Sequence, residues 1–147
     1  MSRWVFNATY GVKSDHPDFN DNLLYLISTN GNFLIYDRRN LKQTVHYSKH
    51  PFDCESKMGP KWGLKMSISP TNLNRFLICG FDENVYICQL EHDKITTLFT
   101  HDGHPYSKDE FEPNVMSLCA LWLPFVSPDT VASCADNTSL QCWQFLA

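Results

Sequence analysis

The chain has 147 residues, of which 43% are hydrophobic and 14% aromatic, and its formal net charge is −4. This composition excludes an intrinsically disordered chain, and the length suffices for one domain with a sizeable core. The sequence has no apolar run of the ~20 residues that a membrane span needs and no signal-peptide core, and its acidic balance argues against a nucleic-acid surface. We therefore expect a cytoplasmic or nuclear protein that binds neither membranes nor nucleic acid directly.

In chain order, the first predicted strand covers residues 3–9, and a polar loop rich in Asp, Asn and Pro follows at residues 11–22. The next segment is the first of three that share one pattern. Each has a short apolar run, a turn containing Gly, Asp or Asn, and a second β-prone run, which together predict a β-hairpin. The three hairpins are Leu23–Asp37, Arg75–Gln89 and Thr130–Gln144.

The other predicted strands flank these hairpins. Residues 41–47 and 94–99 follow the first two as outer strands, and alternation in the former places Leu41, Gln43, Val45 and Tyr47 on one face. Residues 64–68 and 115–123 precede the second and third hairpins as inner strands. The segment 115–123 is apolar on both faces, which is typical of a strand covered from both sides. The predicted groups therefore have four, four and three strands.

The hairpins also recur at similar intervals. They end at Asp37, Gln89 and Gln144, so the repeat is 52 and then 55 residues long. Four-stranded propeller blades recur every ~40–45 residues, so each unit here carries about ten more. The copies end in Tyr-Asp, Cys-Gln and Trp-Gln, where WD repeats place Trp-Asp, and Gly103-His104 stands where a WD repeat places its Gly-His pair. The chain thus resembles a WD-repeat β-propeller.

This resemblance predicts an all-β fold of the WD40 β-propeller type. We expect about three four-stranded antiparallel blades, at about residues 1–47, 64–100 and 115–147. The third lacks its outer strand, and propellers have about 4–8 blades, so these three do not close a ring alone. In many WD propellers the N-terminus of the protein supplies that strand. We expect the C-terminal portion of a ring of about seven blades, whose remaining blades lie outside this chain. A simpler alternative is a truncated product that folds only with the rest of its propeller.

A narrower resemblance rests on five segments. They are residues 77–87, the run Leu98–His104, residues 132–143, the pair Arg3-Trp4 and residues 30–41. Taken in chain order they resemble the family of WD repeat-containing protein 73, and the run Leu98–His104 is the most specific. The match covers nearly all of this chain but only the C-terminal part of that family's propeller, and loops 48–63 and 102–114 differ. The resemblance implies a scaffold of the cytoplasm and spindle that takes part in microtubule organisation. It also implies association with the RNA-cleaving module of the Integrator complex.

The six cysteines are predicted to be reduced. Five lie in predicted strands and Cys54 lies in a loop, and none forms a C-x-x-C pair of the kind found in zinc ribbons. Without a secretory signal, the expected role of such thiols is that of small core hydrophobes. We therefore expect no metal ion and no cofactor.

His101 and His104 form the one paired-imidazole motif of the sequence. A metal or hydrolytic site is one interpretation, with further ligands from the acidic loop 102–114 (Asp102, Asp109 or Glu110). The WD-repeat resemblance implies a structural role instead. There the His of the Gly-His pair bonds a Ser on the second strand, an acidic or amide residue of the next turn and the Trp of the third strand. The matching residues here are His104, Ser133, Asp136 or Asn137, and Trp143.

Two long loops, residues 48–63 and 102–114, join outer strands to inner strands, so in a propeller they emerge on one face. They carry aromatic side chains beside charges, a mixture that suits interface anchors. The candidate partner-binding residues are Phe52, Trp62, Tyr106 and Phe111. The alternative for each is packing against its own blade. We expect a non-enzymatic scaffold for protein–protein interactions.

Overall fold

The computed structural model describes residues 4–8, 22–52, 54, 63–104, 115–123, 125–127 and 129–146. Eleven strands run through these residues, so the all-β prediction is confirmed. The strands are β1 (Trp4–Ala8), β2 (Leu23–Ser28), β3 (Asn32–Asp37), β4 (Asn40–Lys49), β5 (Lys65–Ile68), β6 (Arg75–Cys79), β7 (Val85–Glu91), β8 (Lys94–His101), β9 (Ser117–Trp122), β10 (Thr130–Ala135) and β11 (Leu140–Gln144). Trp62, Tyr106 and Phe111 lie outside the described residues.

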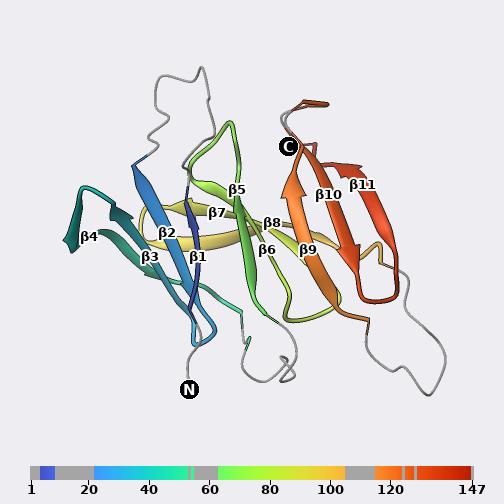
Figure 1. Cartoon of the computed structure of the whole chain (residues 1–147), viewed down its shortest axis with the longest axis horizontal. Coiled ribbons are helices and arrows are strands. Elements are labelled where there is room, and N and C mark those ends of the chain that lie inside the picture. The colour runs from blue at the N-terminus through green and yellow to red at the C-terminus, as the bar shows by residue number, and fades with distance from the viewer. Residues whose placement is uncertain are drawn as a thin grey trace.

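The strands form three antiparallel meanders in chain order, which we call the first unit (β1–β4), the second unit (β5–β8) and the third unit (β9–β11) (Figure 1). Each contains one predicted hairpin, and the register is the same in all three. The first residue of each hairpin pairs with its last, as Leu23 with Asp37, Arg75 with Gln89 and Thr130 with Gln144. The predicted hairpins and the predicted four, four and three strands are therefore confirmed.

The sequence predicted a separate sheet for each unit. The first two units are instead joined. Lys49, at the end of β4, pairs with Lys94, at the start of β8, in parallel orientation, and this one residue pair joins the units into an eight-stranded mixed sheet. The two edge strands of that sheet, β1 and β5, contact one another, so it curves into a nearly closed barrel. The junction exists because β4 extends to Lys49, two residues beyond its predicted end.

Two hydrophobic cores lie between the units. The first fills the space between the first and second units, where the rings of Phe33 and Phe76 stack with centroids 4.9 Å apart. The second lies between β6 and β7 and the third unit, and contains Leu77, Ile87 and Val131, none of them exposed. At roughly 25 cal/mol per Å² of apolar surface removed from water, these cores are the main stabilising term of the fold.

Polar contacts tie the third unit to the second. Buried Ser117 on β9 accepts a hydrogen bond from Gly80 N at 3.2 Å, and its Oγ lies 2.8 Å from each of the carbonyl oxygens of Asp82 and Asn84. Trp122 donates its indole N–H to Ser67 O at 3.1 Å. These bonds fix the orientation of β9 against the β6–β7 turn.

The outward face of the third unit is covered by no other part of the described chain. Leu121 is 54% exposed and Leu140 is 77% exposed, so within this chain segment 115–123 is covered from one side, and its predicted cover from the other side would have to come from blades outside the chain. The cross-strand pairs place small and apolar residues together on this face. They are Cys119, Leu121, Ala132, Cys134, Leu140 and Cys142, and we call them the outer apolar face.

Cysteine environments differ between the units. Cys54, Cys79 and Cys88 are buried, as predicted for core residues, whereas Cys142 is exposed on the outer apolar face. Burial raises the pKa values of both Cys79 and Cys88 to about 12, so these two thiols stay protonated.

Within the described residues, no helix has the length and apolar character needed to cross a membrane.

Candidate functional site

A chain of hydrogen bonds centred on His104 links the end of β8 to the third unit. Trp143 donates its indole N–H to Ser133 Oγ at 3.0 Å, and Ser133 Oγ lies 3.0 Å from His104 Nε2. On the other side of the ring, His104 Nδ1 lies 2.8 Å from Ser139 Oγ, which donates to Asn137 Oδ1 at 2.6 Å. We call these five residues the His104 network.

The donor at one end and the acceptor at the other constrain the directions of these bonds. Because Trp143 can only donate, Ser133 Oγ accepts from it and keeps its own proton for a bond to His104 Nε2. Because Ser139 Oγ donates to Asn137, it accepts the proton of His104 Nδ1. A neutral His104 with its proton on Nδ1 satisfies every group of the network. Burial, with a smaller contribution from nearby His101, lowers the pKa of His104, which agrees with this assignment.

His101 supports the same indole from outside the network. Its ring stacks on Trp143 with centroids 4.2 Å apart and an interplanar angle of 12°. Its Nε2 lies 2.7 Å from Gln141 Oε1, and Gln141 donates its amide N–H to Gly103 O. The segment from His101 to His104 is thus held against β11 at several points.

The structure brings His104, Ser133, Asn137 and Trp143 together but places Asp136 elsewhere. Asp136 Oδ1 instead accepts the backbone N–H of Met116 at 2.9 Å. Asn137 reaches His104 through Ser139, which the sequence analysis did not single out. The signal for Ser139 is its place two residues after an asparagine, since Asn137 Oδ1 also accepts Ser139 N at 3.1 Å in an Asx turn.

The same positions differ in the other two hairpins. Their common register aligns Ser133 with Leu26 and Ile78, and aligns Trp143 with Tyr36 and Cys88. Leu26 and Ile78 have no side-chain hydrogen-bonding group. Apolar side chains therefore take the place of the Ser133 hydroxyl at the corresponding points of the first and second units.

Ring nitrogens of both paired histidines have hydrogen-bond partners in this geometry. Both ring nitrogens of His104 and one of His101 are already bonded. Within the described residues there is no group of three or more His, Cys, Asp or Glu side chains arranged to hold a metal ion. Of the acidic residues proposed as further ligands, Asp102 is exposed, and Asp109 and Glu110 lie outside the described residues.

Phe52 is half-buried and belongs to an aromatic cluster. Its ring centroid is 4.6 Å from that of Tyr86, 5.4 Å from that of Phe81 and 5.8 Å from that of His50. It therefore packs against the second unit, which is the alternative that the sequence analysis left open for it.

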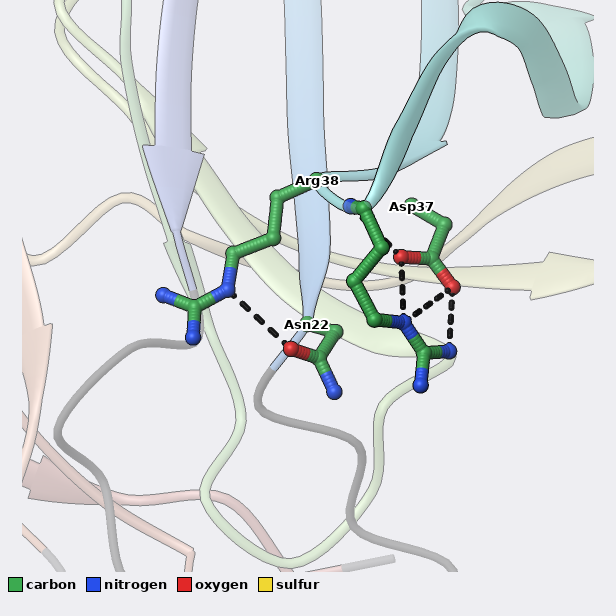
Figure 2. A network of polar contacts seen from close by, with 4 residues as sticks. Asn22, Asp37 and Arg38 are labelled. Carbon is green, nitrogen blue, oxygen red and sulfur yellow. Dashed lines mark hydrogen bonds and ion pairs between the residues drawn. The ribbon is translucent and has the colours of Figure 1, made fainter.

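A second polar cluster lies at the open end of the first hairpin, away from the turn between β2 and β3. Figure 2 shows its side chains. Arg38 donates from Nε to Asn22 Oδ1 at 3.1 Å, and Asn22 O accepts the backbone N–H of Arg38 at 2.8 Å. Arg39 donates from Nε to both carboxylate oxygens of Asp37, at 2.9 and 3.2 Å. These hydrogen bonds lower the pKa of Asp37 to about 2. The cluster orders the turn that leads from β3 into β4.

Comparison with known proteins adds no family assignment, because no family model and no curated protein matches the chain.

Proposed function

We propose that this chain is a non-catalytic scaffold of the WD-repeat type, formed by three consecutive blades of a larger propeller, and that it acts by binding other proteins. The observation that carries this proposal is the threefold use of one hairpin register, with a His-Ser-Trp hydrogen-bond chain in the third copy. That chain has the same residue types as the structural network of WD repeats.

The exposed surface also supports a binding role. The outer apolar face presents Leu121 and Leu140 to solvent, and among the described strands β11 lies at the edge of its sheet and pairs with β10 alone. Contiguous apolar faces on soluble proteins mark interaction surfaces, and an open strand edge can accept a further strand. In this proposal a further blade covers the face, and the complete ring engages its partners.

The resemblance to the family of WD repeat-containing protein 73 supplies a candidate for those partners. On that basis we propose cytoplasmic and spindle-associated pools, a role in microtubule organisation, and association with the RNA-cleaving module of the Integrator complex.

Native mass spectrometry of the tagged chain, purified gently from cytosolic extract, tests the proposal. We expect the chain to appear with a propeller segment and a subunit of the nuclease module. The double variant Leu121→Lys, Leu140→Lys places two charges on the outer apolar face and should lose the propeller segment. The control, Lys42→Gln with Gln43→Lys, changes exposed polar positions on β4 and should retain it. A wild-type chain that is folded, monomeric and free of protein partners would overturn the proposal.

A further inference from the structure

Two cysteine side chains face one another across neighbouring strands of the third unit. Cys119 on β9 and Cys134 on β10 are direct cross-strand partners, and the two strands lie side by side (Figure 1). Directly opposed residues of an antiparallel pair point to the same face of the sheet, which here is the outer apolar face. Both side chains are half-buried, and the structure holds them unlinked.

The separation of the two strands at this point fits a disulfide bond. Leu123 N donates to Thr130 O at 2.8 Å. Four residues further along each strand, Cys119 and Cys134 oppose one another. Hydrogen-bonded pairs recur at every second residue, so these cysteines form such a pair, whose Cα atoms lie about 5.5 Å apart. Disulfides span Cα separations of about 4.4–6.8 Å, most of them near about 5.5–6 Å. The bond therefore requires little displacement of either strand.

The same register disfavours Cys142, the third thiol of the outer apolar face. The residue opposite Cys134 on β11 is Leu140, and Cys142 lies opposite Ala132 instead. Cys142 is thus a diagonal neighbour of Cys134, at a Cα separation of about 7–8 Å, which is longer than a disulfide spans. Within the sheet, Cys119 is the partner that the geometry selects for Cys134.

The surroundings of Cys119 agree with this pairing. Burial, and then the neighbouring Cys134, raises the pKa of Cys119, while Lys65 opposes the shift. An effect of one thiol on the other is expected where their sulfur atoms lie close together. Cys79 lies in the second hydrophobic core with Ala120, which follows Cys119 and points to the opposite face of the sheet. Cys79 is buried, so an oxidant in solution reaches the half-buried pair more readily.

We propose that Cys119 and Cys134 are a modification site, at which hydrogen peroxide forms a reversible disulfide. In the first step the sulfur of Cys134 attacks one peroxide oxygen, the O–O bond breaks, and a sulfenic acid and water result. In the second step the sulfur of Cys119 attacks the sulfenic sulfur and the S–O bond breaks. The departing hydroxide takes up the proton of the Cys119 thiol and leaves as water. Two electrons pass from the two thiols to the peroxide.

The bond would act on the unit that has the least cover. It closes a loop between β9 and β10, which restricts the unfolded chain and so stabilises the folded one. Reduction by a dithiol reverses it through thiol–disulfide exchange. This inference goes beyond the proposed scaffold function and does not depend on it, because it concerns the purified chain alone.

The test is peptide mapping of the purified chain after treatment with hydrogen peroxide. Remaining thiols are capped with N-ethylmaleimide, and the chain is cleaved on the amino side of aspartate. Asp129 and Asp136 lie between the cysteines, so Cys119, Cys134 and Cys142 fall into three different peptides. We expect mass spectrometry to find the first two of these peptides joined, and dithiothreitol to release them. The same treatment in urea should give mixed pairings, because the fold no longer selects the partner.

Substitutions identify the two sulfur atoms. Cys119→Ser and Cys134→Ser should each lose the cross-link, and both replace a half-buried thiol by a hydroxyl, so the fold should persist. Cys142→Ser is the matched control on the same face and should form the cross-link as wild type does. Peroxide should also raise the urea midpoint of Cys142→Ser, and the further change Cys119→Ser should remove that rise.

Three outcomes overturn the inference. The first is that peroxide converts Cys119 and Cys134 to sulfinic or sulfonic acids without a cross-link. The second is that Cys142 or Cys79 replaces either partner in the main cross-linked product. The third is that the folded and the urea-unfolded chain give the same mixture of pairings, which would show that the fold does not select the pair.

Discussion

At the scale of single residues, the His104 network works as a unit because each hydroxyl accepts one proton and donates another. Ser133 allows the clearest test of the network, because its hydroxyl bonds both Trp143 and His104 and the residue is 1% accessible to solvent. Removing its hydroxyl leaves a buried donor and a buried acceptor without a partner, and each such group is costly.

We predict that Ser133→Ala lowers the free energy of unfolding by about 1–3 kcal/mol. Urea unfolding followed by tryptophan fluorescence measures this change. The matched control is Ser127→Ala, which removes only a solvent-exposed bond to Gln144 and should change stability by less than about 0.5 kcal/mol. Equal effects of the two substitutions would contradict the buried network.

Protonation of His104 gives a second prediction. Its pKa lies below the ordinary value of 6.5 in the folded chain, so the unfolded chain binds the proton more readily. Stability is therefore complete above about pH 6.5 and is lost as the pH falls below that value toward the folded-state pKa. His50, whose pKa burial also lowers, contributes in the same direction.

We expect the urea midpoint of the wild type to fall between pH 7.5 and pH 5.5, and to fall less in His104→Gln. The control His92→Asn alters an exposed turn and should leave the wild-type pH dependence intact. A His104→Gln variant with the full wild-type pH dependence would rule out His104 as its source.

At the scale of elements, each hairpin turn contains one residue with positive φ: Gly31 at 91°, Gly80 at 90° and Thr138 at 65°. Gly80 has a further constraint, because a Cβ there would overlap the carbonyl oxygen of Gly63. Its N–H also bonds Ser117, so the turn, the segment before β5 and β9 meet at this residue.

We predict that Gly80→Ala destabilises the chain by at least about 1 kcal/mol, because both φ and the close backbone contact disfavour a side chain. Gly63→Ala is the control, since a Cβ at Gly63 meets no atom within 4 Å. Chemical denaturation of both variants distinguishes them. A Gly80→Ala chain as stable as Gly63→Ala would show that the turn relaxes without cost.

At the scale of the whole molecule, strand positions could be predicted because they depend on local patterns. Alternation and turn residues located all three hairpins, and their ends proved to be cross-strand partners. The union of two units through Lys49 and Lys94 could not be predicted, because it depends on how two sheets lie relative to one another.

The residues of the candidate sites likewise divide into those that a sequence pattern predicts and those that depend on the folded arrangement. His104, Ser133 and Trp143 were predictable from a known repeat pattern, whereas the choice between Asp136 and Asn137 depended on the orientation of side chains in a turn. The cavity of about 800 Å³ between the first and second units gave no sequence signal, because its lining comes from separate elements.

The three thiols on the outer apolar face make that face chemically addressable. Cys142 is exposed and Cys119 and Cys134 are half-buried there, while Cys54, Cys79 and Cys88 lie in the interior. An alkylating reagent applied to the native chain will therefore modify Cys142 first. If a further sheet covers the face, as we propose, the same thiol is shielded, and the rate of its alkylation then reports assembly directly, without mutation and without an attached dye.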